Sequence, residues 1–299
     1  RLTMAPPCSQ NVALGVFALV LAFLYFVFQS GERGEMVSEM DDDYGTPSYI
    51  PAPFRRRRKT KQLIAQSSDL TIPGRTIWVV TTACLPWRTG TSVNPTLRAA
   101  YLLQETPAKA VFLMVPWLEK EDQVLVFGIH KYSAPAEQEV FVRRWLAVEA
   151  NMRDAAQNLN IVFYKGRYVP FTGSIFPTEN LLALIPEQLA DVAILEEPEH
   201  LNWFHPESDL FWRSKFNHVV GIIHTNYLAY SSSERGGMVT TPVVYMVNRW
   251  MVGAHCHKVI KLSGVLQTYA PDKEVVSNVH GVRANFLEIG DQAADVGFA

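Results

Sequence analysis

Acidic, imidazole and aromatic side chains gather in the stretch LEEPEHLNW, which follows a short apolar run. Its carboxylates and imidazole belong to Glu196, Glu197, Glu199 and His200. Carboxylates can accept hydrogen bonds from sugar hydroxyls, and both groups can exchange protons with a reacting molecule. Two neighbouring aromatic residues, Trp203 and Phe204, could stack on a sugar face. The stretch therefore favours sugar binding or acid–base chemistry, with a solvated charged loop as the alternative.

A second polar group follows the apolar residues 218–223 in the stretch GIIHTNY. His224 comes directly after that run, and Thr225 and Asn226 add a hydroxyl and an amide. If the apolar run is a buried strand, His224 emerges at the carboxyl end of that strand. A single histidine is often structural, but this position makes His224 a candidate for a functional role.

A third candidate is the stretch WRTGTSVNP, which we expect to join a strand to a helix. Gly90 allows close approach of the backbone to a ligand, or it serves the turn alone. We expect the helix to begin after Asn94 as N-cap, with Pro95 as its first residue. The free N–H groups at such a helix start suit phosphate or sugar oxygens.

The sequence gives no support for a metal site. Three cysteines, Cys8, Cys84 and Cys256, are too few and too scattered for a disulfide framework or a four-ligand zinc site. Consecutive residues in His255-Cys256-His257 point in different directions, and no second ligand pair has a zinc-like spacing. The signatures G-x-S-x-G and H-E-x-x-H do not occur in the sequence either. We expect neither a metal nor a tightly bound cofactor.

Strand and helix signals alternate from residue 72 onward, and they must position these candidates. The buried-type runs predict strands over 75–83, 110–115, 161–164, 191–196, 218–223, 258–262 and 275–279. Helices are expected from Asn94 to about 105, and over 135–156, 178–189 and 238–254. This alternation predicts an α/β, Rossmann-like fold with a parallel sheet, in which ligands bind beyond the carboxyl ends of the strands.

An unbroken apolar run, Val12–Phe28, precedes this part. Its length is at the short end for a helix that crosses a bilayer. We interpret residues 1–30 as an uncleaved membrane anchor, with a cleaved targeting peptide or a buried core helix as alternatives.

Residues 31–71 are expected to form a disordered linker, acidic at first and basic later. Its basic residues are Arg55, Arg56, Arg57, Arg58, Lys59 and Lys61. Beside a membrane anchor, this block would contact anionic lipid headgroups and help to set topology. A solvated basic stretch and a nuclear localisation signal remain alternatives.

Composition excludes some classes of protein. The 299 residues are 48% hydrophobic and 19% charged, with a formal net charge of −2. These values exclude a chain that is disordered as a whole. Without a basic excess, we expect no nucleic-acid partner.

Several long strings resemble digalactosyldiacylglycerol synthases, among them TTACLPWRTGTSVNPTLRAAYL, EEPEHLNW, NHVVGIIHTNYLAY and VVSNVHGVRANFLEIG. The resemblance runs from about Arg75 to Gly290. It implies the N-terminal, acceptor-binding domain of a retaining GT-B glycosyltransferase of the plastid envelope, at its outer membrane. Such an enzyme transfers galactose from UDP-galactose, its donor substrate, to monogalactosyldiacylglycerol.

The resemblance also implies roles for individual residues. Gly90 and Thr91 match the loop that approaches the donor phosphates. His224 matches the histidine that orients the donor sugar. Glu197, His200, Thr225 and Asn226 lie in motifs expected to bind substrate. Trp87, Trp117, Trp203 and Phe204 are candidates for insertion into the membrane interface.

The implied domain layout is residues 72–290 as the acceptor-binding domain and 291–299 as the start of a second domain. In the family that second domain holds the donor, so we expect a fragment, or a natural acceptor-domain protein, with negligible transferase activity on its own. The alternative function is a catalytically inactive, membrane-anchored galactolipid-binding module. A nicotinamide-dependent oxidoreductase is disfavoured because the G-x-G-x-x-G fingerprint does not occur.

Overall fold

The computed structural model describes residues 67–170, 173–202, 211–226, 237–279 and 292. The chain divides into two compact units, residues 64–226 with 247–299, and residues 1–63 with 227–246. The sheet and the candidate site both belong to the first unit. In the second unit, the described residues 237–246 form the first part of helix α10 (Gly237–His255).

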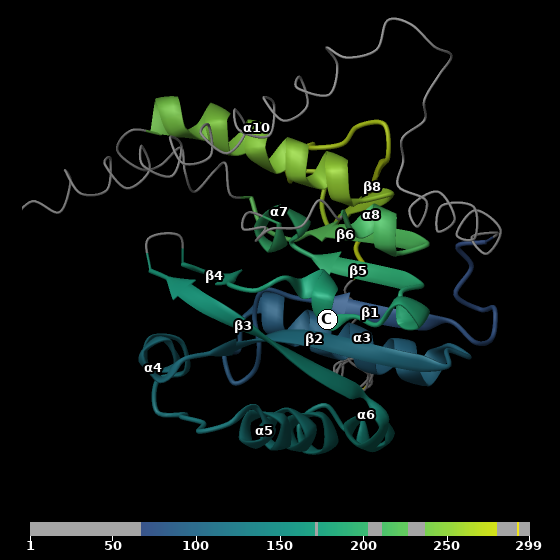
Figure 1. Cartoon of the computed structure of the whole chain (residues 1–299), viewed down its shortest axis with the longest axis vertical. Coiled ribbons are helices and arrows are strands. Elements are labelled where there is room, and N and C mark those ends of the chain that lie inside the picture. The colour runs from purple at the N-terminus through teal and green to yellow at the C-terminus, as the bar shows by residue number, and fades with distance from the viewer. Residues whose placement is uncertain (1–66, 171–172, 203–210, 227–236, 280–291, 293–299) are drawn as a thin grey trace, which may run out of the picture. The chain divides into compact units, whose positions relative to one another are not determined.

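One eight-stranded sheet organises the first unit, in the order β4-β3-β2-β1-β5-β6-β7-β8 (Figure 1). Its strands are β1 (Thr76–Val80), β2 (Ala110–Leu118), β3 (Asn160–Val169), β4 (Ser174–Pro177), β5 (Val192–Glu196), β6 (His218–Ile223), β7 (Lys258–Lys261) and β8 (Glu274–Val276). All neighbours pair in parallel except β3 and β4, which are antiparallel. The predicted Rossmann-like α/β class is confirmed, and all seven predicted strands are present.

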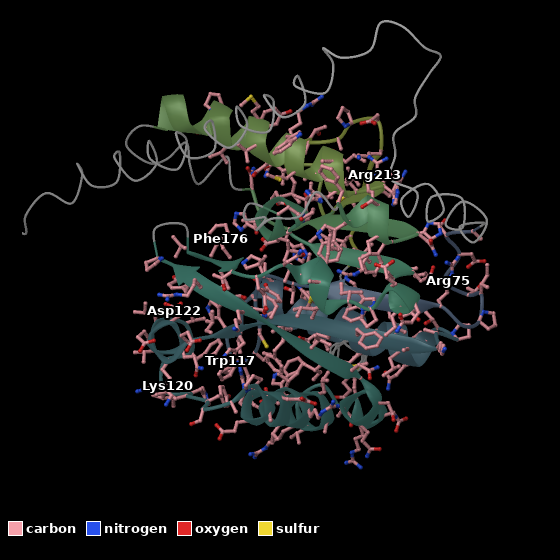
Figure 2. The ribbon with its side chains drawn as sticks, viewed as in Figure 1. Arg75, Trp117, Lys120, Asp122, Phe176 and Arg213 are labelled. Carbon is pink, nitrogen blue, oxygen red and sulfur yellow. The ribbon has the colours of Figure 1, made fainter. Side chains whose placement is uncertain are left out.

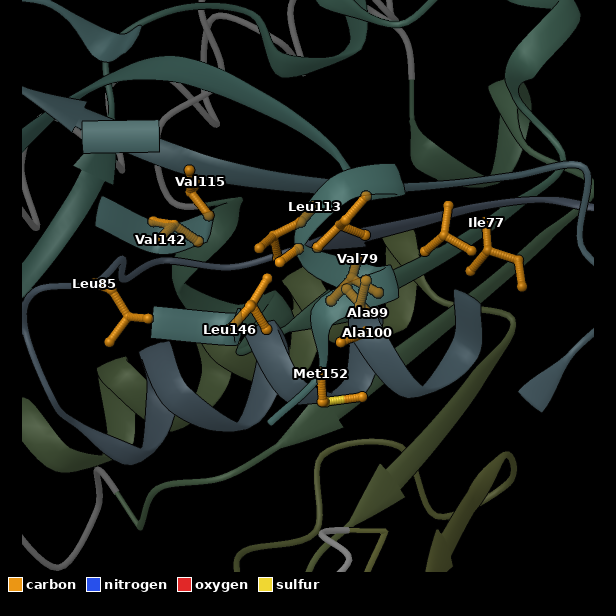
Figure 3. Close-up of a cluster of buried hydrophobic side chains, with 14 of the residues drawn as sticks. Ile77, Val79, Leu85, Ala99, Ala100, Leu113, Val115, Val142, Leu146 and Met152 are labelled. Carbon is orange, nitrogen blue, oxygen red and sulfur yellow. The ribbon is translucent and has the colours of Figure 1, made fainter. Parts of the chain in front are cut away.

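The two central strands carry the core because both of their faces are covered. Every residue of β1 and of β5 is buried, and Ile77 pairs with Val192 in register. One face contributes Ile77 and Val79 to an apolar cluster with helices α3 (Gly90–Glu105), α5 (Pro135–Val148) and α6 (Arg153–Asn158). Figure 3 shows this cluster. Each fully buried aliphatic side chain of this kind contributes about 1.5–3 kcal/mol.

The prediction that the first helix begins after Asn94 is wrong. Helix α3 begins at Gly90, and Pro95 lies inside it. Proline cannot donate to the carbonyl of Thr91 four residues earlier, but the hydroxyl of Thr81 donates to that carbonyl instead, at 2.6 Å. The amides of Ser92 and Val93 both donate to the carbonyl of Thr89, which closes the first turn.

Other helix predictions were wrong in detail. The expected helix over 135–156 is interrupted between α5 and α6, where Asn151 has a φ of 55°. The segment 178–189 forms two short 3₁₀ helices, Leu181–Leu184 and Glu187–Leu189, separated around Pro186. Helix α4 (Lys120–Phe127) and strand β4 were not predicted. Two further short helices are α7 (Pro198–Leu201) and α8 (Trp212–Lys215).

Several sequence-based predictions lie outside the described residues. These are the apolar run 12–28, the basic block 55–61, Trp203, Phe204 and nearly all of 280–299. Within the described ranges, none of the helices has the length and apolar character needed to cross a bilayer.

Candidate functional site

The polar stretches that follow β1, β5 and β6 meet at the carboxyl edge of the sheet. These three strands are parallel neighbours, so Thr82, Glu197 and Thr225 come from adjacent strand ends. The hydroxyl of Thr82 donates to Glu197 Oε2 at 2.8 Å, and the hydroxyl of Thr225 donates to Oε1 at 2.9 Å. The structure therefore brings two of the predicted motifs into direct contact.

Glu197 is held by its backbone as well as by these hydroxyls. It adopts a left-handed conformation, with φ 59° and ψ 60°, and caps the N-terminus of α7. Its carbonyl accepts from the amides of His200 and Leu201, and its own amide donates to Ile222 on β6. Glu197 is only 2% exposed. Its position makes it a brace between strand ends rather than a group at the surface.

Glu196, at the last position of β5, is fully buried between two nitrogen-bearing side chains. Arg98 Nε on α3 donates to its Oε1 at 2.6 Å, and His224 Nε2 meets its Oε2. Burial by itself raises the pKa of Glu196, but the hydrogen bond and charge of His224, aided by Arg98, outweigh it and lower the pKa. Glu196 is therefore an ionised carboxylate at neutral pH.

Glu199 differs from its two neighbours. It is fully buried, and neither of its carboxyl oxygens has a hydrogen-bond partner among the residues that the structure describes. Burial, and then repulsion from Glu197, raise the pKa of Glu199 well above its usual value. Glu199 therefore holds its proton to a higher pH than an exposed glutamate does.

His200 lies behind the site. It is 4% exposed, and its ring is tilted against that of Phe176, with 5.5 Å between centroids. Burial lowers the pKa of His200, although the Glu197 carboxylate opposes this shift. A neutral imidazole packed against β4 (Phe176 is labelled in Figure 2) supports the site from within.

Gly90 and Thr91 lie in the first turn of α3. Gly90 is exposed, its φ is not positive, and an added Cβ would meet only Asn94 Nδ2, at an ordinary 3.5 Å. Local backbone geometry therefore does not require glycine there. Thr91 contributes its carbonyl to Thr81 and its hydroxyl to a 3.0 Å contact with Thr89.

Asn226 is tied to the loop that follows β7. Its amide donates to the carbonyl of Val265 at 3.3 Å. The amide of Gln267 donates to the carbonyl of Thr225 at 3.1 Å and to the Tyr269 hydroxyl at 2.7 Å. The loop after β7 therefore fixes the segment that carries His224, a contact that no local sequence pattern indicates.

A groove of about 240 Å³ runs along α3 beside the site. It is lined by Asn94, Leu97, Arg98, Tyr101, Leu102, Glu105, Thr106 and Val279. Arg98 joins this groove to the carboxylate network, because its guanidinium also donates to the carbonyl of Val279 at 3.0 Å. Sequence reasoning missed Arg98, and also Thr82.

Two of the expected membrane-inserting tryptophans are packed against the protein. Trp87 meets Tyr168 edge-on at 6.1 Å, and Trp117 meets Phe163 edge-on at 6.4 Å (Trp117 is labelled in Figure 2). Both side chains are half-buried. Core packing therefore accounts for much of their apolar surface.

Comparison with known proteins confirms the resemblance seen in the motifs. No family model matches the chain. Digalactosyldiacylglycerol synthase 1, chloroplastic, of Glycine max is 46% identical over 221 residues, which are 74% of this chain and 27% of that protein. Digalactosyldiacylglycerol synthase 2, chloroplastic, of Arabidopsis thaliana is 46% identical over 215 residues, which are 72% of this chain and 44% of that protein. Digalactosyldiacylglycerol synthase 1, chloroplastic, of Arabidopsis thaliana is 45% identical over 222 residues, which are 74% of this chain and 26% of that protein.

The chain thus spans between about a quarter and a half of the length of these relatives. A match of 221 residues cannot fit in a chain of 299 residues without including residues 79–221. The matched region therefore contains β5 and the Glu196–His200 motif.

Proposed function

We propose that this chain, a homologue of the digalactosyldiacylglycerol synthases, forms the acceptor-binding part of a galactolipid galactosyltransferase. The proposed reaction moves galactose from UDP-galactose to the headgroup of monogalactosyldiacylglycerol, with retention of the anomeric configuration. The single observation that carries this proposal is 41–46% identity to six synthases over 72–76% of the chain. The relatives are named chloroplastic, which supports a plastid location, and we propose the outer envelope membrane.

The geometry supports a division of roles at the strand ends. On this proposal His224 hydrogen-bonds the donor sugar and orients it. Gly90 and Thr91 approach the donor phosphates, where the first turn of α3 offers backbone N–H groups to an anion. Glu197, Thr225 and Asn226 support the site through hydrogen bonds to one another or to the loop after β7, and His200 supports it by packing against Phe176.

The proposed chemistry places negative charge on the departing nucleotide phosphate. Cationic groups aimed at that phosphate would stabilise it in the transition state. We propose that these groups and the remaining donor contacts come from residues outside this sequence. Accordingly, the isolated chain should bind the acceptor lipid without transferring galactose.

An immunoblot of the source cells with an antibody against residues 75–290, paired with a transfer assay on the captured protein, tests this proposal. We expect a band well above 33.7 kDa and transfer of labelled galactose from UDP-galactose to monogalactosyldiacylglycerol. In that protein, His224→Ala should lower turnover by orders of magnitude, and the exposed His130→Ala serves as the matched control. Equal turnover in the His224→Ala and His130→Ala variants would contradict the proposed role of His224.

A band at or below 33.7 kDa without transfer would instead favour the galactolipid-binding module. Vesicle flotation then decides, using the 299-residue chain and vesicles with or without monogalactosyldiacylglycerol. Vesicles with added anionic lipid test the basic residues of segment 55–61. Equal binding to vesicles with and without each of these two lipids would contradict both proposed functions.

A further inference from the structure

We propose that Glu196 is a positioning residue that holds His224 in one tautomer and one orientation, and that Arg98 fixes Glu196 in turn. Only the importance of that orientation for galactose transfer rests on the proposed function. The hydrogen-bonding arrangement itself is a property of this chain and can be tested without any substrate.

Glu196 has both of its carboxylate oxygens committed to different elements. Oε1 accepts from Arg98 Nε on α3 at 2.6 Å, and Oε2 meets Nε2 of His224, which follows β6. The side chain of Glu196 is 0% exposed, and that of His224 is 5% exposed. Rotation of the carboxylate would break both contacts in a place where water cannot replace them.

An ionised carboxylate can only accept hydrogen bonds, so Nε2 of His224 must carry a proton. In the neutral ring, Nδ1 is then the acceptor, and the two ring nitrogens have different chemical roles. The partner at Nε2 thereby decides whether Nδ1 accepts or donates a hydrogen bond. This is how a buried carboxylate orients a histidine in other sites.

Arg98 completes the arrangement from the opposite side. Its guanidinium also donates to the carbonyl of Val279 at 3.0 Å, and its side chain is only 11% exposed. Two fixed acceptors for one planar group restrict its rotation. Through Arg98, these hydrogen bonds connect three separate parts of the chain: α3, the end of β5 and the segment after β8. Glu196 therefore cannot shift unless all three parts move with it.

The backbone beside His224 is restrained as well. The carbonyl of Thr225 accepts from the amide of Gln267, and the hydroxyl of Thr225 donates to Glu197. The imidazole is therefore fixed at its ring by Glu196 and at the next residue by two further contacts. Such restraint at both ends is expected for a side chain that must hold one orientation.

Nuclear magnetic resonance of the 299-residue chain labelled with ¹⁵N-histidine tests the inference directly. His224→Gln identifies the resonances of this ring. We expect the neutral ring to carry its proton on Nε2, with that proton shifted downfield and slow to exchange with water. A proton on Nδ1, or rapid exchange between the two tautomers, overturns the inference.

Three variants separate the roles of the partners. Glu196→Gln offers either an acceptor or a donor, so we expect mixed tautomers and loss of the slowly exchanging proton. Arg98→Lys keeps a positive charge but lacks the planar guanidinium that bonds both Glu196 and Val279, and the Nε2 tautomer should persist. Glu199→Gln changes a buried glutamate in the same motif whose carboxyl oxygens have no hydrogen-bond partner among the described residues, so it is the matched control and should leave the ring unchanged. Because the wild-type ring is informative by itself, the test survives if Glu196→Gln does not fold.

Transfer assays on the active native protein then separate this inference from the proposed function. Glu196→Gln should lower kcat by about 10- to 100-fold with little change in KM for the acceptor, as is usual for a residue that orients another. A ring fixed on Nε2–H in a protein where His224→Ala keeps its full rate supports the positioning and overturns the catalytic role of His224. If the His224 ring exchanges between tautomers while the enzyme is active, the positioning by Glu196 is overturned and the proposed function is not.

Discussion

Thr82 and Glu197 are 115 positions apart in the sequence, yet the threonine hydroxyl donates to the carboxylate at 2.8 Å inside the protein. Hydrogen bonds to charged, buried groups stabilise a fold by about 1.5–3 kcal/mol. We therefore expect Thr82→Val, which keeps the shape and removes the hydroxyl, to lower the free energy of unfolding by about that amount. Urea denaturation followed by circular dichroism measures the change.

Thr178→Val is the matched control for this substitution. The Thr178 hydroxyl donates to a carbonyl, that of Lys165, and the residue is exposed. Water can replace that contact, so the loss should stay within about 0.5 kcal/mol. Equal losses in the two variants would mean that the bond between Thr82 and Glu197 does not stabilise the strand ends.

The close packing at Gly221 gives a second prediction. A Cβ on this residue of β6 would lie 2.7 Å from Cys256 Sγ and 2.7 Å from Pro198 Cγ, both of which are held in the interior. Gly221→Ala should therefore destabilise the protein by about 1–3 kcal/mol. Gly253→Ala, in α10 with no atom within 4 Å of the new Cβ, should be neutral or stabilising. Thermal unfolding of both variants checks the contrast, and a tolerated Gly221→Ala would contradict the packing.

The buried Glu199 predicts a pH-dependent stability. Burial and the Glu197 carboxylate raise the pKa of Glu199 above its ordinary value of 4.5, so the folded protein holds this proton more tightly than the unfolded chain. The stability that Glu199 contributes is complete below about pH 4.5 and is lost as the pH rises toward the folded-state pKa. Glu199→Gln stays neutral, so its stability relative to wild type should increase as the pH rises above the ordinary glutamate pKa of 4.5.

Urea titrations at several pH values measure that difference, with the exposed Glu105→Gln as the control for loss of a carboxyl group. Two titratable groups interact electrostatically with the Glu199 carboxyl, those of Glu197 and Cys256. Burial raises the pKa of the Cys256 thiol to about 12. A difference between Glu199→Gln and wild type that does not vary with pH would show that Glu199 is solvated or paired in the folded state.

A buried ion pair between β7 and β8 gives the fourth prediction. Lys261 Nζ lies 2.8 Å from Glu274 Oε1, and the two side chains are 7% and 6% exposed. Removing one partner leaves a buried charge, so Lys261→Met should cost about 3–5 kcal/mol. Lys258→Met, on the exposed face of the same strand, should change stability by less than about 0.5 kcal/mol. Similar effects of the two substitutions on the urea midpoint would refute the buried pair.

The sheet was predictable because burial imposes its own pattern. The runs that became β1, β5 and β6 are apolar except for one polar residue at an end of each strand, as is typical of strands covered on both faces. Strand β4 was missed because its four residues, SIFP, form a strand only through antiparallel pairing with β3. The start of α3 was misplaced because the local signal at Asn94 and Pro95 was overridden by a tertiary contact. In that contact the hydroxyl of Thr81 donates to the carbonyl of Thr91.

The site was predictable only in part, for a related reason. Strand ends locate Glu196, Glu197 and His224, since parallel strands finish at a common edge. Their partners come from distant positions: Arg98 is 98 residues from Glu196, and Gln267 is 42 from Thr225. Side chains that act through such partners leave no local pattern. For that reason the sequence suggested that Glu197 and Asn226 face a ligand, whereas the structure engages them within the protein.

The order of the strands has a consequence for how the chain folds as it is synthesised. Among the described strands β1 is made first, but its neighbour β5 pairs with it only after more than one hundred further residues have been added. Until then one edge of β1 is unsatisfied, and its apolar face can associate with other chains. Contacts of such long separation in the chain form slowly. Ribosome-bound nascent chains that stop before residue 192 should therefore depend on chaperones, and this dependence should fall once β5 has emerged.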